Sequence, residues 1–223
     1  MTSKPMRKIH FDLLRILAMM LVMLFHYTTQ FSKTVQPTDF WVFFSSKYSD
    51  FAVALFLLMV GFFSYKSIKK KDATAQDYLK NRLLRLLPTF WLCLIITTLV
   101  LTISGTSHIL LKQFVLNALL INRFFNVPFV DGVYWYLLIV LVFTAFVTLA
   151  LAVKGFNRRI TLYVLYVTAF VILGVINQYV HALPKIISFA LFEYVNKCFI
   201  GLFLAFLYYE GKNVDAKYSG GYC

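Results

Sequence analysis

Charged side chains are scarce in this sequence of 223 residues. Lys, Arg, Asp and Glu together make up 14% of it, whereas 61% of its residues are hydrophobic. A soluble domain of this size needs a more polar surface to remain dissolved. The mean hydropathy of +0.76 therefore indicates that lipid surrounds much of the chain.

Acidic residues are scarcer than basic ones, and cysteine is rare. Nine Asp and Glu stand against 22 Lys and Arg, which gives a formal net charge of +13. In a soluble protein that excess would favour nucleic-acid binding. Cys93, Cys198 and Cys223 have neither CxxC nor metal-ligand spacing, so we predict no metal site and interpret the cysteines as packing residues.

Apolar residues gather into runs that are long enough to cross a bilayer, which takes about 20 residues in a helix. No small-residue cleavage site follows the first run, so we interpret it as a retained helix and not as a signal peptide. The predicted spanning helices are residues 9–31, 41–64, 86–105, 133–153, 160–180 and 186–209. The expected fold is an all-α integral membrane protein, a bundle of six transmembrane helices with additional interfacial amphipathic helices.

The basic residues are sorted by loop, which sets the expected orientation. With a cytoplasmic N-terminus, one side of the membrane receives 15 of them: Lys4, Arg7, Lys8, Lys66, Lys69, Lys70, Lys71, Lys80, Arg82, Arg85, Lys154, Arg158, Arg159, Lys212 and Lys217. The other side receives only Lys33, Lys47, Lys112, Arg123 and Lys185. Such an asymmetry predicts that the richer side is cytoplasmic.

The segments between the spans are short, so we predict one membrane domain over residues 1–211 and a polar tail over 212–223. Residues 66–82 are expected to form an amphipathic cytoplasmic connector that ends in a helix entering the membrane. Residues 106–124 are helical in period and are placed flat on the outer interface. No internal repeat of the kind found in many transporters is present.

A polar stripe runs along the first apolar segment. Asp12 lies three residues before Arg15, and His26 lies 11 residues after Arg15. In an α-helix all three share one side, with Arg15 and His26 about 16 Å apart along the axis. His26 is either a structural histidine or a catalytic group facing the protein interior. Arg15 is either a snorkelling base, locally paired with Asp12, or part of the same site.

Arg82 and Arg85 lie three residues apart at the cytoplasmic end of the third predicted span. They are either ordinary flanking charges or an anion site, because guanidinium groups bind phosphates through paired hydrogen bonds. Pro88, one turn further on, can kink the helix and open a cleft there.

Four further residues are candidates for structural or functional roles. Gly61 permits close approach of either a neighbouring helix or a ligand. Trp135 stands at the outer boundary, where aromatic residues commonly mark the interface. Glu193 and Lys197, four residues apart, are expected to form an ion pair that either lines a cavity or braces the bundle.

Taken in order, four patterns resemble the acyltransferase-3 family of bacterial membrane O-acyltransferases, which acylate cell-surface polysaccharides, peptidoglycan and related glycans. The resemblance is specific in the combination of the first and third patterns and covers residues 8–150 best. The matching residues are Asp12, Arg15 and His26 in the first pattern, Met59–Phe62 in the second, Arg82, Arg85, Leu86 and Pro88 in the third, and Trp135, Tyr136 and Leu137 in the fourth.

The chain departs from the family's pattern at two positions and in length. Val60 stands where the family has Ser, and Val140 stands where many members have Glu. Family members usually have about ten spanning helices, whereas we count six candidates in this chain. The chain is therefore expected to be a member truncated at its C-terminal side.

The resemblance implies a donor and an acceptor. The donor is acyl-CoA in the cytoplasm, most often acetyl-CoA, and the acceptor is a hydroxyl of a surface glycan or glycolipid. Cofactor-binding residues are then Arg82 and Arg85, which would meet the phosphates of CoA, together with Gly61 and Trp135. The location is the bacterial cytoplasmic membrane, and no nucleic-acid partner is expected.

The resemblance also implies catalytic roles. His26 is expected to be the general base for the acceptor hydroxyl or a transient acyl carrier. Arg15, oriented by Asp12, would place the donor or stabilise charge on the thioester oxygen. Two alternatives stay open at this point: a transporter or flippase component for a polysaccharide precursor, and a non-catalytic fragment.

Overall fold

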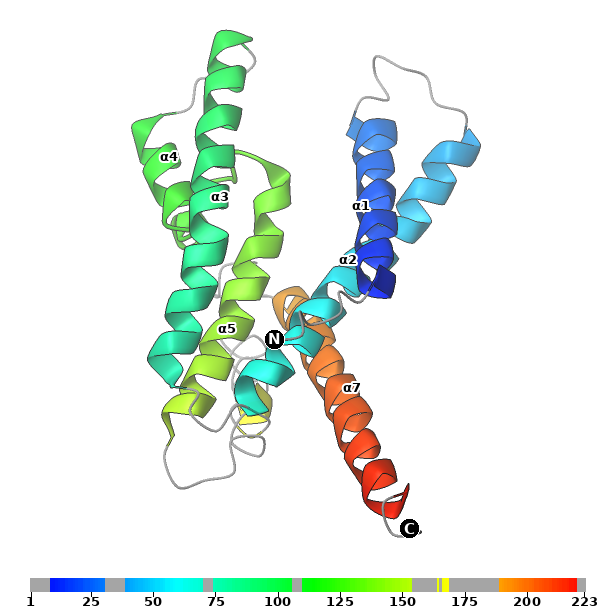
Figure 1. The fold of residues 1–223 in the computed structure, drawn as a ribbon. Helices are drawn as coiled ribbons and strands as arrows, with labels where there is room; N and C mark the ends of the chain where they lie inside the picture. Colours follow the sequence, from blue (N-terminus) through cyan, green and yellow to red (C-terminus); the bar gives the residue numbers. More distant parts are fainter. Residues whose placement is uncertain are drawn as a thin grey trace, which may run out of the picture. The chain divides into compact units, whose positions relative to one another are not determined.

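The structure is a computed structural model of the chain. It describes residues 9–30, 39–69, 74–105, 110–153, 164, 166–168 and 189–219. Nearly all of these residues lie in helices or turns, and none of the residues in those ranges forms a β-strand (Figure 1). The predicted all-α fold is confirmed.

Six α-helices and two short 3₁₀ helices are described. They are α1 (Ile9–Gln30), α2 (Asp39–Lys69), α3 (Ala75–Ile103), α4 (Leu111–Ala118), η1 (Asn122–Phe125), η2 (Gly132–Tyr134), α5 (Trp135–Ala152) and α7 (Phe189–Ser219). Within the described residues, four segments are long and apolar enough to cross a membrane: Ile9–His26, Tyr48–Lys69, Ala75–Ile103 and Gly132–Ala152. The chain is therefore an all-α, multi-pass membrane protein. The span predicted over 160–180 lies almost wholly outside the described residues.

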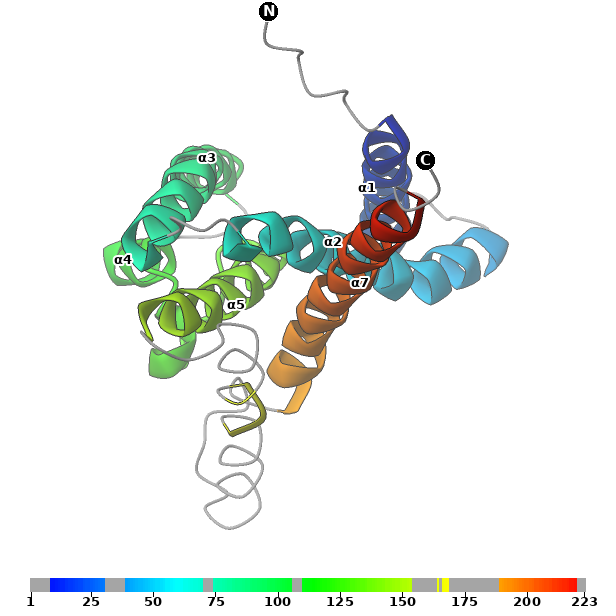
Figure 2. The same ribbon diagram turned by 60° about the horizontal axis from the view of Figure 1, so that its bottom comes forward.

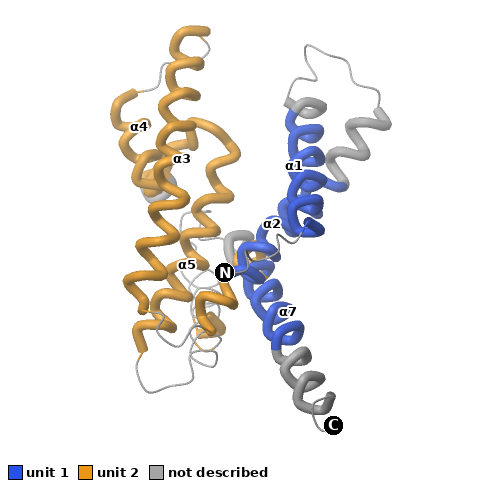
Figure 3. The backbone as a smooth tube through the Cα atoms, in the orientation of Figure 1, with its two compact units in different colours: residues 1–63, 197–223 blue, residues 64–196 orange. Residues whose placement is uncertain are grey.

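The chain divides into two compact units, shown in different colours in Figure 3. Unit 1 comprises residues 1–63 and 197–223, and unit 2 comprises residues 64–196. The divisions fall within α2 and α7, so each of these helices contributes one part to each unit.

In unit 1, α2 and α7 cross at two glycines. A Cβ atom added to Gly61 would overlap the backbone oxygen of Cys198, and one added to Gly201 would overlap the backbone oxygen of Leu58. Both glycines are therefore required for the two backbones to approach so closely. The crossing is visible in both ribbon views (Figures 1 and 2).

Replacing Gly61 or Gly201 by alanine is expected to lower the free energy of unfolding by about 2 kcal/mol, because an overpacked contact forces the helices apart. Denaturant unfolding in detergent micelles measures the change. Gly132→Ala is the matched control, since a Cβ there meets no atom within 4 Å. Equal stability of all three variants would contradict the close crossing.

In unit 2, α3 and α5 lie side by side in both ribbon views (Figures 1 and 2). Phe90 and Leu94 of α3 pack with Leu120 and Tyr134 in a buried cluster. The Phe90 and Tyr134 rings meet edge to face with their centroids 5.1 Å apart. The Tyr134 hydroxyl donates to Thr97 Oγ1 at 3.2 Å, so the phenol of this buried residue has a partner.

Helices α2 and α3 extend beyond the predicted spans into the connector predicted over 66–82, whose end was expected to be a helix entering the membrane. Helix α2 continues to Lys69, with Tyr65 and Ile68 buried in unit 2. Helix α3 begins at Ala75 because Thr74 caps it: Thr74 Oγ1 accepts from the Asp77 backbone N–H at 3.0 Å. The helix runs through Pro88 without a break, and the kink predicted there stays a prediction.

Buried amides hold the segment between α3 and α5, and Asn117 makes the most contacts. Asn117 donates to the carbonyls of Gln113 (2.8 Å) and Pro128 (3.1 Å), and its Oδ1 accepts from the Val130 N–H at 3.1 Å. On the opposite side of α4, the apolar residues Leu111 and Val115 are exposed. An apolar outer face suits the interfacial position predicted for residues 106–124, although the α-helix itself is only eight residues long.

Candidate active site

Arg15 and Asp12 form an ion pair on α1, as their spacing predicts. Arg15 Nη1 donates to Asp12 Oδ1 at 3.3 Å. The Arg15 side chain is 47% exposed and the Asp12 side chain 26%, so the pair adds little to stability in water. The ion pair acts on charge: the Asp12 carboxylate compensates the charge of the Arg15 guanidinium.

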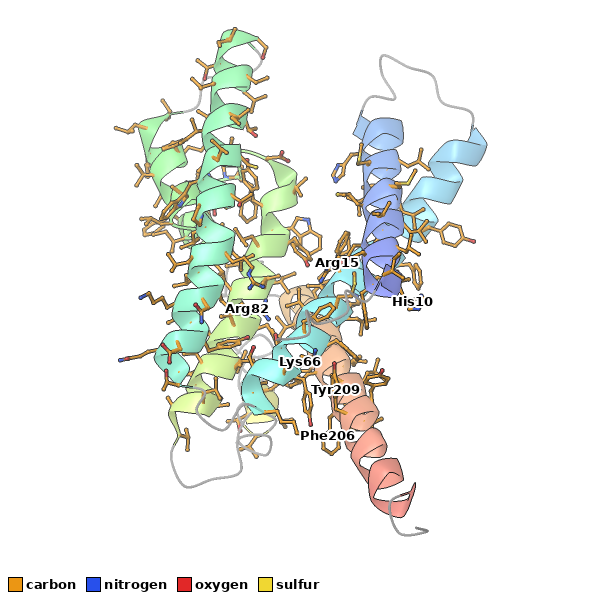
Figure 4. All side chains as sticks on the ribbon, in the orientation of Figure 1. His10, Arg15, Lys66, Arg82, Phe206 and Tyr209 are labelled. Carbon is orange, nitrogen blue, oxygen red and sulfur yellow. The ribbon has the colours of Figure 1, made fainter. Side chains whose placement is uncertain are left out.

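Aromatic rings surround the same turn of α1. The Arg15 guanidinium carbon lies 4.9 Å from the centroid of the Phe63 ring, a cation–π distance. The Phe11 ring lies 5.0 Å from that of Phe63 and 5.2 Å from that of Phe62. Arg15, labelled in Figure 4, is therefore on the side of α1 that packs against α2 within unit 1.

His26 lies on the same helix, which is continuous from Ile9 to Gln30. At 1.5 Å and about 100° per residue, 11 residues place it about 16 Å from Arg15 along the axis and within about 20° around it. Its ring is half-buried and meets the Phe25 ring edge to face, with the centroids 5.5 Å apart. Ala18, the one fully buried residue among those described in α1, lies between the two on this side.

Arg82 is the centre of a polar cluster in unit 2. Its Nη2 donates to Ser64 Oγ on the last part of α2, and the Tyr78 hydroxyl donates to the same oxygen at 3.4 Å. The guanidinium carbon lies 5.6 Å from the centroid of the Tyr78 ring. Tyr78 is one turn before Arg82 on α3, and both Ser64 and Tyr78 are buried. Figure 4 labels Arg82 on α3.

Arg82 and Arg85, the two arginines of the third pattern, have no carboxylate partner within the described part of the chain. Arg82 has the Ser64 hydroxyl as its hydrogen-bond acceptor and no carboxylate there. Arg85 is exposed and likewise has no carboxylate partner among the described residues. Two uncompensated guanidinium groups one turn apart can bind a phosphate, whose oxygens accept paired N–H bonds.

The structure places Gly61 and Trp135 in packing contacts. The α7 backbone occupies the space beside Gly61, so this glycine permits helix packing, the first of its two interpretations. Trp135 begins α5, and its ring centroid lies 4.8 Å from that of Tyr194. Contact of either residue with a cofactor stays a prediction. So does the ion pair between Glu193 and Lys197, which lie one turn apart on α7.

Two side chains of the Arg82 cluster, Ser64 and Tyr78, were not predicted from the sequence. Tyr78 is four residues before Arg82, a spacing that places them on one helix face and was a usable signal. Ser64 is 18 residues from Arg82 on another helix, so no local spacing connects them.

Comparison with protein families matches residues 9–221 to the acyltransferase-3 family, which is described as an acyltransferase domain. No curated protein and no solved structure matches the chain. The family match takes in both arginine motifs and the helix that carries His26. It covers nearly the whole sequence, and with the apolar helices described above it shows a membrane acyltransferase: the chain belongs to the acyltransferase-3 family.

Proposed function

We propose that the chain transfers an acetyl group from cytoplasmic acetyl-CoA to a hydroxyl of a cell-surface glycan or glycolipid. Membership of the family supports acyl transfer. The observation that carries the choice of donor is Arg82, a guanidinium that is held by a neutral hydroxyl and that lacks a carboxylate partner within the described residues. Such a group is suited to the phosphates of CoA, which are the charged part of an acyl-CoA donor.

His26 and Arg15 of α1 then have different roles in the reaction. His26 accepts the proton of the acceptor hydroxyl while that oxygen attacks the thioester carbonyl carbon. The tetrahedral intermediate collapses, the C–S bond breaks, and the proton passes to the departing CoA thiolate. The acetyl ester of the glycan and free CoA are the products.

Arg15 is better placed to hold the donor than to stabilise the oxyanion. Its guanidinium is bonded toward Asp12, which lies on the N-terminal side of its own turn. The distance to the turn of His26 is therefore at least about 16 Å along the helix, too far for both groups to touch one reacting carbon. Of its two predicted roles, placing the donor is the one this geometry supports.

The proposed location is the bacterial cytoplasmic membrane with the N-terminus inside. The basic loops support this orientation because Arg82 and Arg85 then face the compartment that contains acyl-CoA. The acceptor would approach from the outer side. Transfer along α1 would carry the acetyl group part of the way across the bilayer.

The test is transfer of radiolabel from [acetyl-¹⁴C]-CoA by the purified chain in liposomes, with bacterial envelope glycan as acceptor. Label in the glycan, with release of one CoA thiol per acetyl, is expected. A parallel measurement follows entry of an unacylated glycan precursor into the liposomes. Precursor flux without acetyl transfer would establish the transporter alternative, and neither activity would establish the non-catalytic one.

A further inference from the structure

We infer that Ser64 and Tyr78 form a neutral cradle that positions Arg82 for a phosphate of the donor. This inference rests on the proposed function, because it concerns how that donor is held. Neither Ser64 nor Tyr78 belongs to the four patterns that carry the family resemblance. Both are positioning residues, since they act through Arg82 and not on the reacting atoms.

The geometry of the cradle fixes the guanidinium from two directions. Ser64 Oγ accepts from Arg82 Nη2, and the Tyr78 hydroxyl donates to the same oxygen. The Tyr78 ring lies beneath the guanidinium, with 5.6 Å between its centroid and the Arg82 carbon. One hydrogen bond and one ring face restrain the guanidinium of a long, flexible side chain, so less entropy is lost when a ligand binds.

The cradle holds the guanidinium without cancelling its charge. A guanidinium has five N–H donors, and Ser64 takes one of them. A carboxylate in the place of Ser64 would offer the same anchor but would compete with the phosphate for the positive charge. Arg15 shows the contrast, because Asp12 accepts its hydrogen bond and compensates its charge.

Burial of Ser64 and Tyr78 restricts the positions that the Arg82 guanidinium can take. The Ser64 side chain is fully buried, and Tyr78 is 5% exposed. Hydroxyl groups in such a place keep their hydrogen-bond partners, since an unpaired buried polar group is costly. Ser64 therefore remains bonded to Arg82 and fixes where the remaining N–H groups point.

The experiment measures equilibrium binding of CoA to the full chain in detergent micelles, without turnover. Ser64→Ala is expected to raise the Kd for CoA about tenfold, and Tyr78→Phe about threefold, because the guanidinium is no longer fixed. Ser64→Asp is expected to raise it about a hundredfold, since its carboxylate neutralises Arg82. Tyr134→Phe is the matched control: it removes the hydroxyl of a buried tyrosine from a part-buried hydroxyl pair in the same unit, and the Kd is expected to stay unchanged.

A second readout separates positioning from general damage to the fold. Acetyl-pantetheine carries the thioester without the phosphates of CoA. The KM for acetyl-CoA is expected to rise in Ser64→Ala, while the KM for acetyl-pantetheine and kcat with either donor keep their wild-type values. Should Ser64→Ala fail to fold, judged by its thermal transition, Tyr78→Phe provides the same comparison.

Three results would overturn the inference. Wild-type Kd for CoA in both Ser64→Ala and Tyr78→Phe would overturn it alone and leave the proposed function standing. Equal losses with acetyl-CoA and acetyl-pantetheine would show a merely structural role. Absence of CoA binding by the wild-type chain would overturn both proposals together, whereas CoA binding without acetyl transfer would contradict the proposed function only.

Discussion

Replacing His26 by alanine is expected to lower the rate of acetyl transfer by a factor of about 10²–10⁴, the usual contribution of a positioned acid or base. The acceptor hydroxyl has a high pKa and is a weak nucleophile unless a base takes its proton as it attacks. His26 lies at the C-terminal end of the apolar segment Ile9–His26, on the side of α1 that carries Arg15. Initial rates of radiolabel transfer from acetyl-CoA, at saturating donor, measure the effect.

His10→Ala is the matched control for this substitution. It removes an imidazole from the same helix, but His10 is exposed and lies two residues before Asp12, at the beginning of α1. We expect His10→Ala to keep the wild-type rate, and both variants to keep the helical circular-dichroism signal and the thermal transition of the wild type. A His26→Ala protein that folds and transfers acetyl at the wild-type rate would refute the assignment of His26 as the base.

The same protein distinguishes the two predicted roles of His26. Without acceptor, a transient acyl carrier accumulates radiolabel on the chain, and that label disappears in His26→Ala. A general base accumulates none. Given the proposed mechanism, in which the hydroxyl attacks the thioester directly, we expect no label on the chain in either protein.

The helices that could be predicted from the sequence are those whose ends coincide with the ends of an apolar run. The first span was predicted over 9–31 and the helix occupies Ile9–Gln30, because the apolar segment Ile9–His26 takes up most of that length. The third span was predicted to begin at 86, after a connector that ends in a helix, and α3 is one continuous helix that begins at Ala75. Hydropathy detects the part of a helix that suits lipid, whereas its polar first turns are set by the Thr74 cap.

In the candidate site, the contact within one helix could be predicted from the sequence, and the contact between two helices could not. The ion pair of Asp12 and Arg15 follows from a spacing of three residues on one helix, and it is confirmed. The anchor of Arg82 does not follow from spacing, because Ser64 is on α2 and the contact depends on how α2 and α3 pack. The family pattern points to Val60, where the family has a hydroxyl, and not to Ser64, one helical turn further along.

Replacing Arg82 by alanine is expected to raise the KM for acetyl-CoA by about 10- to 100-fold, which corresponds to the loss of a charged hydrogen-bonded contact of about 1.5–3 kcal/mol. Arg85→Ala is expected to have a smaller effect, because Arg85 is exposed and no side chain in the described part of the chain fixes its guanidinium. Arg82→Lys should recover only part of the loss, since an ammonium group cannot make the paired bonds of a guanidinium. Steady-state kinetics with varied acetyl-CoA give these values.

The effect of Arg82 must be separated from that of a general positive field around this end of α3. Lys80→Ala removes the same unit of charge two residues away, from an exposed side chain, and is expected to change KM by less than about twofold. A local phosphate contact also predicts that the ratio of KM values, Arg82→Ala over wild type, stays near 1 with acetyl-pantetheine, which has no phosphate to lose. If Lys80→Ala and Arg82→Ala raise KM equally, the site is a diffuse basic surface, and the uncompensated guanidinium on its serine anchor has no special part in holding the donor.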